Sequence, residues 1–141
     1  MQNNFISDYF NADHQRLDLI FDRFKSKLKS EPAICDFNAF SMGLLKHIEW
    51  EESLLFPKFE VKTGMINQGP TMVMKKEHHL LKMILKAIRE NIDNQSAWEY
   101  IEELEDVIKN HNHKEERILY PEIDRLLSDE EKTNIAIELG V

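Results

Sequence analysis

The chain has 141 residues, 42% of them hydrophobic, and a formal net charge of −8. This length suits one compact domain with a single core, and the negative charge argues against binding to nucleic acid or to an anionic membrane surface. No apolar run is long enough to span a membrane, and the first residues lack the pattern of a signal peptide. A single cysteine, Cys35, excludes an internal disulfide and favours a reducing, cytoplasmic location.

Apolar residues recur at helical spacing from the start of the chain. They predict a first helix near 8–29, with His14 on its apolar stripe. Asp36 has the side chain of a helix N-cap, so a second helix is expected near 37–61. Gly64 and the Gly69-Pro70 pair then bracket a loop.

The second half of the chain repeats this pattern of helices. Pro70 and Thr71 open a third helix that is expected to run to about residue 92. Ser96, with Glu99 three residues later, resembles a capping box for a fourth helix near 97–127. Ser128 with Glu131 starts a short fifth helix, near 129–139, which either covers one end of the fold or stays mobile.

A set of potential metal-ligand residues returns at a constant offset in the chain. The repeated pairs are Asp13-His14 with Glu77-His78, and His47-x-x-x-Glu51-Glu52-x-x-Leu55-Phe56-Pro57 with His111-x-x-x-Glu115-Glu116-x-x-Leu119-Tyr120-Pro121. Both offsets are 64 residues, since 78 − 14 = 64 and 111 − 47 = 64. A solvated helix has no reason to keep His, Glu and Pro in register, whereas a pseudo-symmetric site with matching ligands from two halves does.

No segment alternates with the period of a β-strand. Four long amphipathic helices with short loops predict an all-α, antiparallel four-helix bundle made of two pseudo-symmetric αα-hairpins. The bundle should span about 8–127, and the short C-terminal helix has no counterpart in the repeat. We expect residues 1–141 to form one domain.

The spacing of the repeated residues places them on the core side of their helices. Residues i and i+4 share a helix face, so His47 and Glu51 point the same way, as do His111 and Glu115. Apolar residues flank these pairs: Leu44, Leu54 and Leu55 around the first, and Leu104, Ile108, Ile118 and Leu119 around the second. His14 and His78 lie on similar apolar stripes.

Four histidines and two glutamates thus converge in an apolar bundle, where an unpaired carboxylate costs several kcal/mol. Two divalent cations would remove that cost, and imidazole with carboxylate suits iron, zinc or manganese. The symmetric arrangement assigns His14 and His47 to one metal and His78 and His111 to the other. Glu51 and Glu115 would bridge the two metals.

These residues resemble the hemerythrin-like (HHE cation-binding) domains, over about residues 10–127. The resemblance implies a four-helix bundle around a non-haem di-iron centre, with zinc or manganese as substitutes. It implies binding of a small diatomic ligand, dioxygen or nitric oxide, or of iron itself in some members. The ligand roles fall on six residues: His14, His47, Glu51, His78, His111 and Glu115.

One position departs from the oxygen-carrying members of that family, which have a fifth histidine one turn from another ligand on the third helix. One turn from His78 stand Lys82 and Met74. The asymmetry that leaves one iron open in the carriers is therefore missing. Stable, reversible oxygen carriage is not expected from this pattern.

Several neighbouring residues have structural interpretations. His79 and His113 are rotated away from the ligand face and are expected at the surface, although His113 could also support a ligand. Glu52 and Glu116 are expected on a solvated face. Asp13 and Glu77 either accept hydrogen bonds from ligand imidazoles or complement helix dipoles. The aromatic residues before the two prolines, Phe56 and Tyr120, are expected to plug one end of the bundle, while the prolines bend or end their helices.

The sequence predicts a non-enzymatic di-iron protein that binds dioxygen or nitric oxide in a sensing, scavenging or carrier role. One alternative is an enzyme-like role in iron–sulfur cluster repair or in nitric oxide or peroxide turnover. A further alternative is iron sensing or storage. The pattern assigns no nucleic-acid or membrane partner and sets no oligomeric state.

Overall fold

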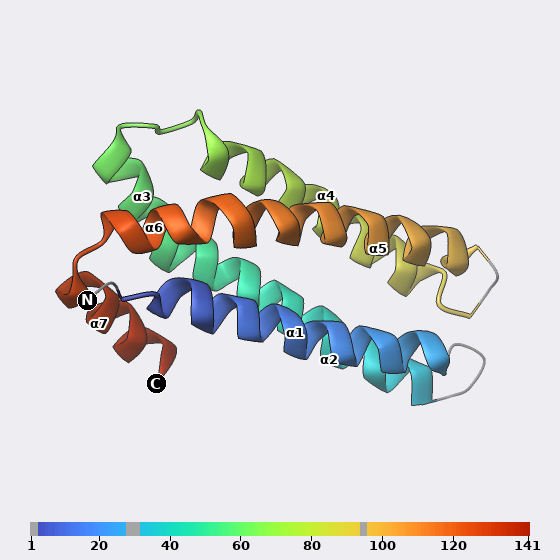
Figure 1. Ribbon diagram of the computed structural model, residues 1–141. Coiled ribbons are helices and arrows are strands. Elements are labelled where there is room, and N and C mark those ends of the chain that lie inside the picture. The colour runs from blue at the N-terminus through green and yellow to red at the C-terminus, as the bar shows by residue number, and fades with distance from the viewer. Residues whose placement is uncertain (1–2, 28–31, 94–95) are drawn as a thin grey trace.

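The computed structural model describes residues 3–27, 32–93 and 96–141, and within these ranges it contains helices and no strands. The elements are α1 (Phe5–Ser26), α2 (Pro32–Trp50), the π turn η1 (Glu51–Leu55), α3 (Phe56–Thr63), α4 (Pro70–Glu90), α5 (Ala97–Lys114), the π turn η2 (Glu115–Leu119), α6 (Tyr120–Leu126) and α7 (Asp129–Leu139). They form four long rods that run up and down: α1 is the first, α2 with η1 and α3 the second, α4 the third, and α5 with η2 and α6 the fourth. The short helix α7 lies across one end of the rods (Figure 1). The predicted four-helix bundle with a short C-terminal helix is therefore confirmed. None of the described helices is long and apolar enough to cross a membrane.

The start of the second rod differs from the prediction. α2 begins at Pro32, so Asp36 lies inside the helix and is not its N-cap. Proline suits a first helical turn, because its fixed φ is helical and its missing N–H would have no partner there. The Asp36 carboxylate instead lies 3.3 Å from Lys27 Nζ, just beyond the end of α1. The last two residues predicted for the first helix, 28 and 29, fall outside the described ranges.

The two prolines of the repeat widen their helices and do not end them. The backbone N–H of Phe56 donates to the Glu51 carbonyl, and that of Tyr120 donates to the Glu115 carbonyl, so each turn closes over five residues. Pro57 and Pro121 follow directly. Each lacks an N–H, and its ring would clash with the carbonyl four residues earlier. The helix accommodates the proline as a single π turn and then continues as α3 or α6.

The π turns also change which residues face the core. A π turn needs more residues to complete a rotation than an α turn does, so Leu119, eight residues after His111, faces inward and is 2% exposed. Ile118, which the helical spacing had placed beside the second ligand pair, is 65% exposed. The prediction for Ile118 was therefore wrong.

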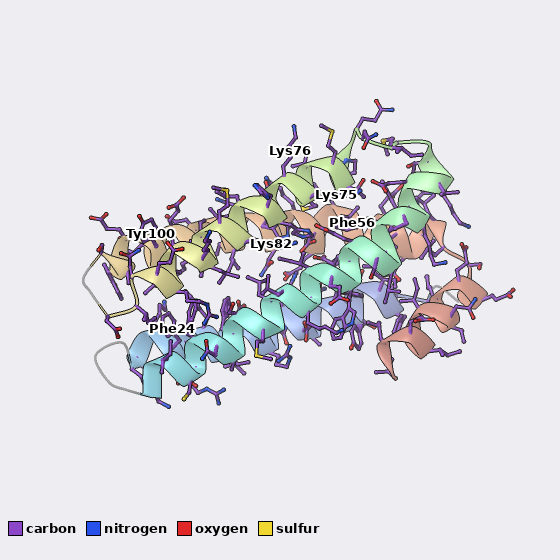
Figure 2. The ribbon with its side chains drawn as sticks, turned by 180° about the vertical axis from the view of Figure 1, so that it is seen from behind. Phe24, Phe56, Lys75, Lys76, Lys82 and Tyr100 are labelled. Atoms are coloured by element: carbon purple, nitrogen blue, oxygen red, sulfur yellow. The ribbon has the colours of Figure 1, made fainter. Side chains whose placement is uncertain are left out.

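Two apolar clusters divide the core of the bundle along its length. One lies toward the 27–32 and 93–96 connections and contains Phe24, with Tyr100 packed against it. The other lies toward α7 and contains Phe56. Figure 2 shows Phe24 and Tyr100 near one end of the rods and Phe56 nearer the other. Four buried histidines and two buried glutamates lie between these two clusters: His14, His47, Glu51, His78, His111 and Glu115.

The short helix α7 covers the end of the bundle where α1 begins. It starts at Ser128, as predicted, and Ser128 forms a capping box with Glu131: the Ser128 hydroxyl accepts from the Glu131 N–H and the Glu131 carboxylate accepts from the Ser128 N–H. Its Lys132 is 3% exposed, donates to the Asn3 carbonyl, and lies 3.4 Å from the Asp124 carboxylate. Asp124 also accepts the first backbone N–H groups of α1, from Ile6 at 2.9 Å and Ser7 at 2.8 Å. One carboxylate thus joins α1, α6 and α7.

We expect Asp124→Ala to lower the free energy of unfolding by roughly 3 kcal/mol, because it leaves the buried Lys132 ammonium without its counter-charge and two backbone N–H groups of α1 without an acceptor. Urea unfolding followed by circular dichroism measures the change. The matched control is Glu122→Ala, which removes an exposed pair with Arg125 on the same helix and should cost no more than about 0.5 kcal/mol. Equal unfolding midpoints for the two variants would contradict this account of the α1 end.

Candidate metal centre

The structure brings together all six residues that the repeat singled out. The histidines come from the four rods, His14 from α1, His47 from α2, His78 from α4 and His111 from α5, and the glutamates open the two π turns, as Glu51 and Glu115. All six are at most 3% exposed. They form a polar layer between the two apolar clusters.

The donor atoms of these residues form two groups that share one carboxylate. His14, His47 and Glu115 supply one group, and His78, His111, Glu51 and Glu115 supply the other; within each group the donor atoms lie within 4.8 Å of one another. Oε1 of Glu115 lies 3.2 Å from Nε2 of His14 and also 3.2 Å from Nε2 of His111. This carboxylate therefore lies between the two halves of the protein.

The second carboxylate, that of Glu51, also lies near histidines of both halves. Glu51 Oε1 is 3.1 Å from Nε2 of His78, and Glu51 Oε2 is 3.6 Å from Nε2 of His47. Glu51 and Glu115 thus occupy equivalent positions about the pseudo-two-fold axis. Glu51 presents one oxygen to each imidazole pair, whereas a single oxygen of Glu115 lies near one imidazole of each pair.

Three buried nitrogen or oxygen atoms in this layer have no hydrogen bond of acceptable geometry: Glu51 Oε1, Glu115 Oε2 and His78 Nε2. An unsatisfied buried polar atom costs about 1–3 kcal/mol, and more when it is charged. These three atoms come from residues of one group, with His78 Nε2 lying 4.0 Å from Glu115 Oε2. A cation among them would satisfy all three, so the residues present fit a bound metal.

Each ligand-type imidazole is held from behind by a carboxylate. Nδ1 of His47 donates to Asp13 at 2.8 Å, and Nδ1 of His111 donates to Glu77 at 2.9 Å. This hydrogen bond turns Nε2 toward the centre and makes it the nitrogen that is free to bind a metal once the imidazole is neutral, which is the arrangement of metal-binding histidines in general. Of the two interpretations left open for Asp13 and Glu77, the structure supports the hydrogen bond to an imidazole.

The other two imidazoles are held by residues that were expected on a solvated face. Nδ1 of His14 donates to Glu116 at 2.7 Å, and Nδ1 of His78 donates to Glu52 at 2.6 Å. The Glu52 and Glu116 side chains are 33% and 39% exposed, so they lie at a partly solvated face, but their hydrogen bonds to the imidazoles were not predicted. Each reaches across from one hairpin to a histidine of the other. The one signal in the sequence was that both glutamates recur at the same offset as the ligands.

The aromatic residue that ends each π turn faces the centre and does not plug the end of the bundle. The Tyr120 hydroxyl donates to Glu51 Oε2 at 2.6 Å and lies 3.1 Å from Glu115 Oε1. Its counterpart Phe56 stacks on the His78 ring, with centroids 5.7 Å apart and planes 9° apart. The sequence analysis missed the role of Tyr120, because the helical spacing alone does not show the rotation that the π turn adds.

In the metal-free protein, the buried carboxylates stabilise the charged form of the imidazoles, and the imidazoles stabilise the charged form of the carboxylates. Burial alone would lower the pKa of His47, but the Glu51 charge and the hydrogen bond to Asp13 outweigh it and raise the pKa to about 10. In the same way, burial is outweighed by the Glu115 carboxylate at His111, which raises the pKa of His111 to about 9. Burial would raise the pKa of Glu51, but the charge of His47, with a contribution from His78, holds it well below its usual range. The protonated imidazoles therefore take the place that cations would take.

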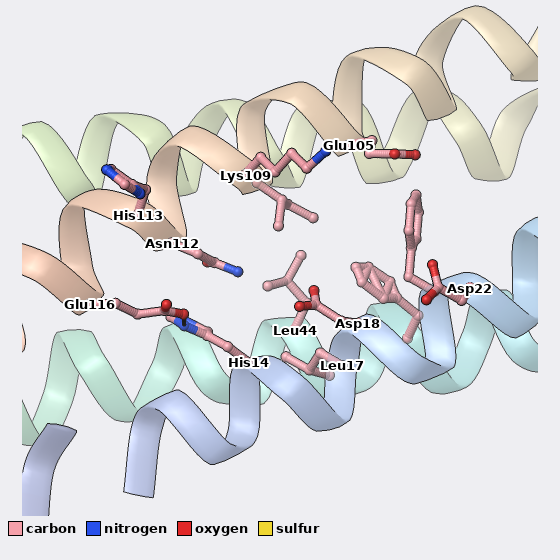
Figure 3. Close-up of a pocket in the computed structure, with 13 residues that line it drawn as sticks. His14, Leu17, Asp18, Asp22, Leu44, Glu105, Lys109, Asn112, His113 and Glu116 are labelled. Carbon is pink, nitrogen blue, oxygen red and sulfur yellow. Dashed lines mark hydrogen bonds and ion pairs between the residues drawn. The ribbon is translucent and has the colours of Figure 1, made fainter. Parts of the chain in front are cut away.

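A pocket of about 400 Å³ opens beside this layer, between α1 and α5. Its floor is apolar and its rim is charged, with Asp18 on α1 and Lys109 on α5 (Figure 3). His14 and Glu116 form its inner wall, where the carboxylate lies against the imidazole. The pocket therefore connects the surface with the back of one ligand-type histidine.

The two histidines outside the polar layer, and the two residues one turn from His78, do not supply ligand atoms to the centre. His79 and His113 are exposed. His113 lines the rim of the pocket. Lys82 is exposed, and Met74 is buried in the apolar cluster near α7. Neither supplies a further imidazole to the centre.

Comparison with known proteins points to one family. The family model of the hemerythrin HHE cation binding domain matches residues 6–123. An uncharacterised hemerythrin-like protein of Schizosaccharomyces pombe is 31% identical over 134 residues, which make up 93% of this chain and 65% of that protein. A Nostoc protein named as a DNA nickase is 26% identical over 136 residues, 94% of this chain and 37% of that protein. The chain thus spans less than two thirds of the length of these relatives. No solved structure matches.

We expect the metal-free protein to lose stability as the pH rises from about 7 to about 10. His47 and His111 have folded pKa values of about 10 and about 9, above the unfolded value of about 6.5. The folded state therefore holds more protons, and the stabilisation is complete below the unfolded pKa and disappears as the pH passes through the folded one. Urea midpoints of the chelator-treated protein across this range measure the loss.

The matched comparison for this pH dependence is the metal-loaded protein. A bound cation replaces the protons on the imidazoles, so the urea midpoint of the metal-loaded protein should not fall over the same pH range. A metal-free midpoint that stays constant or rises with pH would show that the buried imidazoles are neutral.

Proposed function

Because the chain belongs to the hemerythrin HHE cation-binding family, we propose that it holds two non-haem iron ions and binds dioxygen or nitric oxide at them, in a sensing or scavenging role. The proposed protein ligands are the six buried residues of the polar layer: His14, His47, Glu51, His78, His111 and Glu115. The observation that carries the proposal is that carboxylate and imidazole atoms without hydrogen bonds lie close together in the polar layer. In this layer a carboxylate accepts a hydrogen bond from Nδ1 of every imidazole.

The distances support a division of the ligands into two halves. His14 and His47 would hold one metal, and His78 and His111 would hold the other. Glu115 supports a bridging role most directly, since its Oε1 is equally far from one imidazole of each pair, at 3.2 Å. Glu51 supports the same role, with one oxygen directed to each half.

The donor types support iron as the metal. Imidazole nitrogen with carboxylate oxygen, in the absence of thiolate, suits iron, zinc and manganese, and Cys35 is an exposed free cysteine outside the polar layer. Carboxylate-bridged iron pairs in four-helix bundles are built from facing helices in this way. Zinc or manganese could substitute. A bound iron pair would supply the coordination positions and the electrons that a diatomic ligand needs.

The surroundings of the centre support access by a small molecule. The pocket between α1 and α5 ends at the His14 ring and at Glu116, which holds that ring. The pocket floor is apolar, which suits uncharged gases better than anions, and Asp18 and Glu105 on the rim disfavour anions further. A diatomic gas would thus reach the centre from the α1 side.

A second candidate role is an enzyme-like redox function, such as nitric oxide or peroxide turnover or iron–sulfur cluster repair. The observation that favours it over reversible oxygen carriage concerns the third rod. Lys82 is exposed and Met74 is buried among apolar side chains, so neither completes the ligand set of one metal. Iron sensing or storage is a further alternative, in which loading of the centre would itself be the signal.

The activity named for the Nostoc relative is not proposed here. The chain matches 37% of that protein. Its net charge of −8 opposes association with a polyanion, for which proteins generally use a basic surface.

We expect His47→Ala and His111→Ala each to lower the iron content from about two per chain, because an apolar wall offers no replacement ligand. The matched controls are His79→Ala and His113→Ala, which remove exposed imidazoles and should leave the iron content unchanged. Metal analysis of protein loaded under nitrogen measures it. If both ligand variants retain the wild-type content, the ligand assignment is wrong.

We expect the diferrous protein to oxidise in one direction when it is mixed with oxygenated buffer, because the chain lacks the fifth histidine that the oxygen-carrying members of the family have. Stopped-flow absorption should show a shift to a diferric spectrum that deoxygenation does not reverse, and zinc-loaded protein should show no change. Anaerobic mixing with nitric oxide should also alter the spectrum of the iron form. A spectrum that returns to its starting form on deoxygenation would instead support a carrier role.

A further inference from the structure

The Tyr120 hydroxyl lies among four atoms of the proposed ligands. Its oxygen is 3.1 Å from Nε2 of His47 and 3.2 Å from Nε2 of His14. It is 2.6 Å from Glu51 Oε2 and 3.1 Å from Glu115 Oε1. In the metal-free protein this oxygen therefore lies between the two imidazoles that would hold the first metal.

A metal bound by His14 and His47 must lie close to that oxygen. Metal-to-ligand distances for nitrogen and oxygen are about 2.0–2.2 Å, and both imidazole nitrogens are already 3.1–3.2 Å from the hydroxyl. The metal and the hydroxyl cannot share one position. Either the tyrosine moves out of the layer, or its oxygen shifts by about an ångström or two and contacts the metal.

The packing around Tyr120 opposes a large movement. The residue is fully buried. Its ring lies against Phe10, with centroids 5.5 Å apart, and against the His14 ring, with centroids 5.7 Å apart. Its backbone N–H closes the π turn by donating to the Glu115 carbonyl. A large movement would break these contacts in a close-packed interior, so a small shift is the less costly choice.

We propose that the phenol oxygen of Tyr120 is an additional protein ligand of the metal at His14 and His47. This inference rests on the proposed function, since it assumes metal at that position. On coordination the O–H proton leaves to solvent and the oxygen binds as phenolate, with no change in the oxidation state of the metal. The hydroxyl that donates to Glu51 in the metal-free protein then becomes a donor to the cation.

The other half of the centre has no such oxygen. Phe56 stands at the equivalent position, since 120 − 56 = 64, and its ring stacks on His78. The three unsatisfied buried atoms of the polar layer belong to the group around His78. The position open to an external ligand is therefore on the metal at His78 and His111, and Tyr120 closes the equivalent position on the other metal.

Resonance Raman spectroscopy of the ferric protein tests the proposal, with iron content measured on the same sample. The chain has three tyrosines, Tyr9, Tyr100 and Tyr120. We expect iron-enhanced tyrosinate ring vibrations that persist in the Tyr9→Phe/Tyr100→Phe double variant and disappear in Tyr120→Phe. The double variant attributes the signal to Tyr120 even if Tyr120→Phe fails to fold.

The outcomes separate this inference from the proposed function. Iron-loaded wild-type protein without tyrosinate vibrations overturns the role of Tyr120 and leaves the di-iron proposal standing, as do vibrations lost in the double variant. Protein that takes up no iron overturns both. Nitric oxide, an uncharged molecule, serves as the probe of the open position: it should change the spectrum of the diferrous wild-type protein, and Phe56→Tyr should lose that change. An equal nitric oxide response in Phe56→Tyr, or no response in wild type, overturns the assignment of the open position.

Discussion

The polar layer depends on two carboxylates, Glu51 and Glu115, buried side by side in an apolar bundle. Neither has any exposed surface, and two unpaired charges in such a place would cost more than the fold could supply. Four imidazoles surround them, and in the metal-free protein the carboxylates raise the pKa of His47 to about 10. The four outer carboxylates in turn hold the imidazoles, so the whole layer is organised around compensating these two charges. A pair of cations meets the same need without protons.

The position of these carboxylates follows from the backbone. Each opens a π turn that the following proline imposes, and each turn lies in the middle of a rod, between the two apolar clusters. The wider turn changes the direction of the residues after it, so Glu52 and Glu116 reach the opposite hairpin and Tyr120 faces inward. A regular α-helix would not place these residues and the ligand pair on their observed partners. The π turn therefore couples a local sequence feature, His-x-x-x-Glu with a proline six residues after the Glu, to the construction of the centre.

The sequence predicted those parts of the protein that depend on local spacing and on the repeat. Amphipathic periodicity predicted the rods, and the His-x-x-x-Glu spacing with its copy 64 residues later predicted which six side chains meet, as at His47 and His111. The partners of the imidazoles were harder to predict. Asp13 lies next to His14 in sequence but binds His47, and Glu116 lies on a different hairpin from His14. The first contact depends on how two helices pack within a hairpin and the second on how the two hairpins dock, and periodicity within one helix encodes neither. Asp36 failed as an N-cap for a simpler reason, because Pro32 was already able to start the helix.

The centre is nearly symmetric, and its one clear asymmetry is a single oxygen atom. The pairs His14 with Glu116 and His47 with Asp13 are matched by His78 with Glu52 and His111 with Glu77. Tyr120 and Phe56 are matched in position but differ in chemistry. Two equivalent metals would offer an external ligand two equivalent positions, so a di-metal centre that binds one diatomic molecule needs some difference between its halves. Oxygen-carrying relatives obtain this difference from an extra histidine on the third helix, whereas this chain has Lys82 and Met74 there. The tyrosine at the end of the second π turn provides a different route to the same result, since it reaches the half opposite to the one that retains unsatisfied donor atoms.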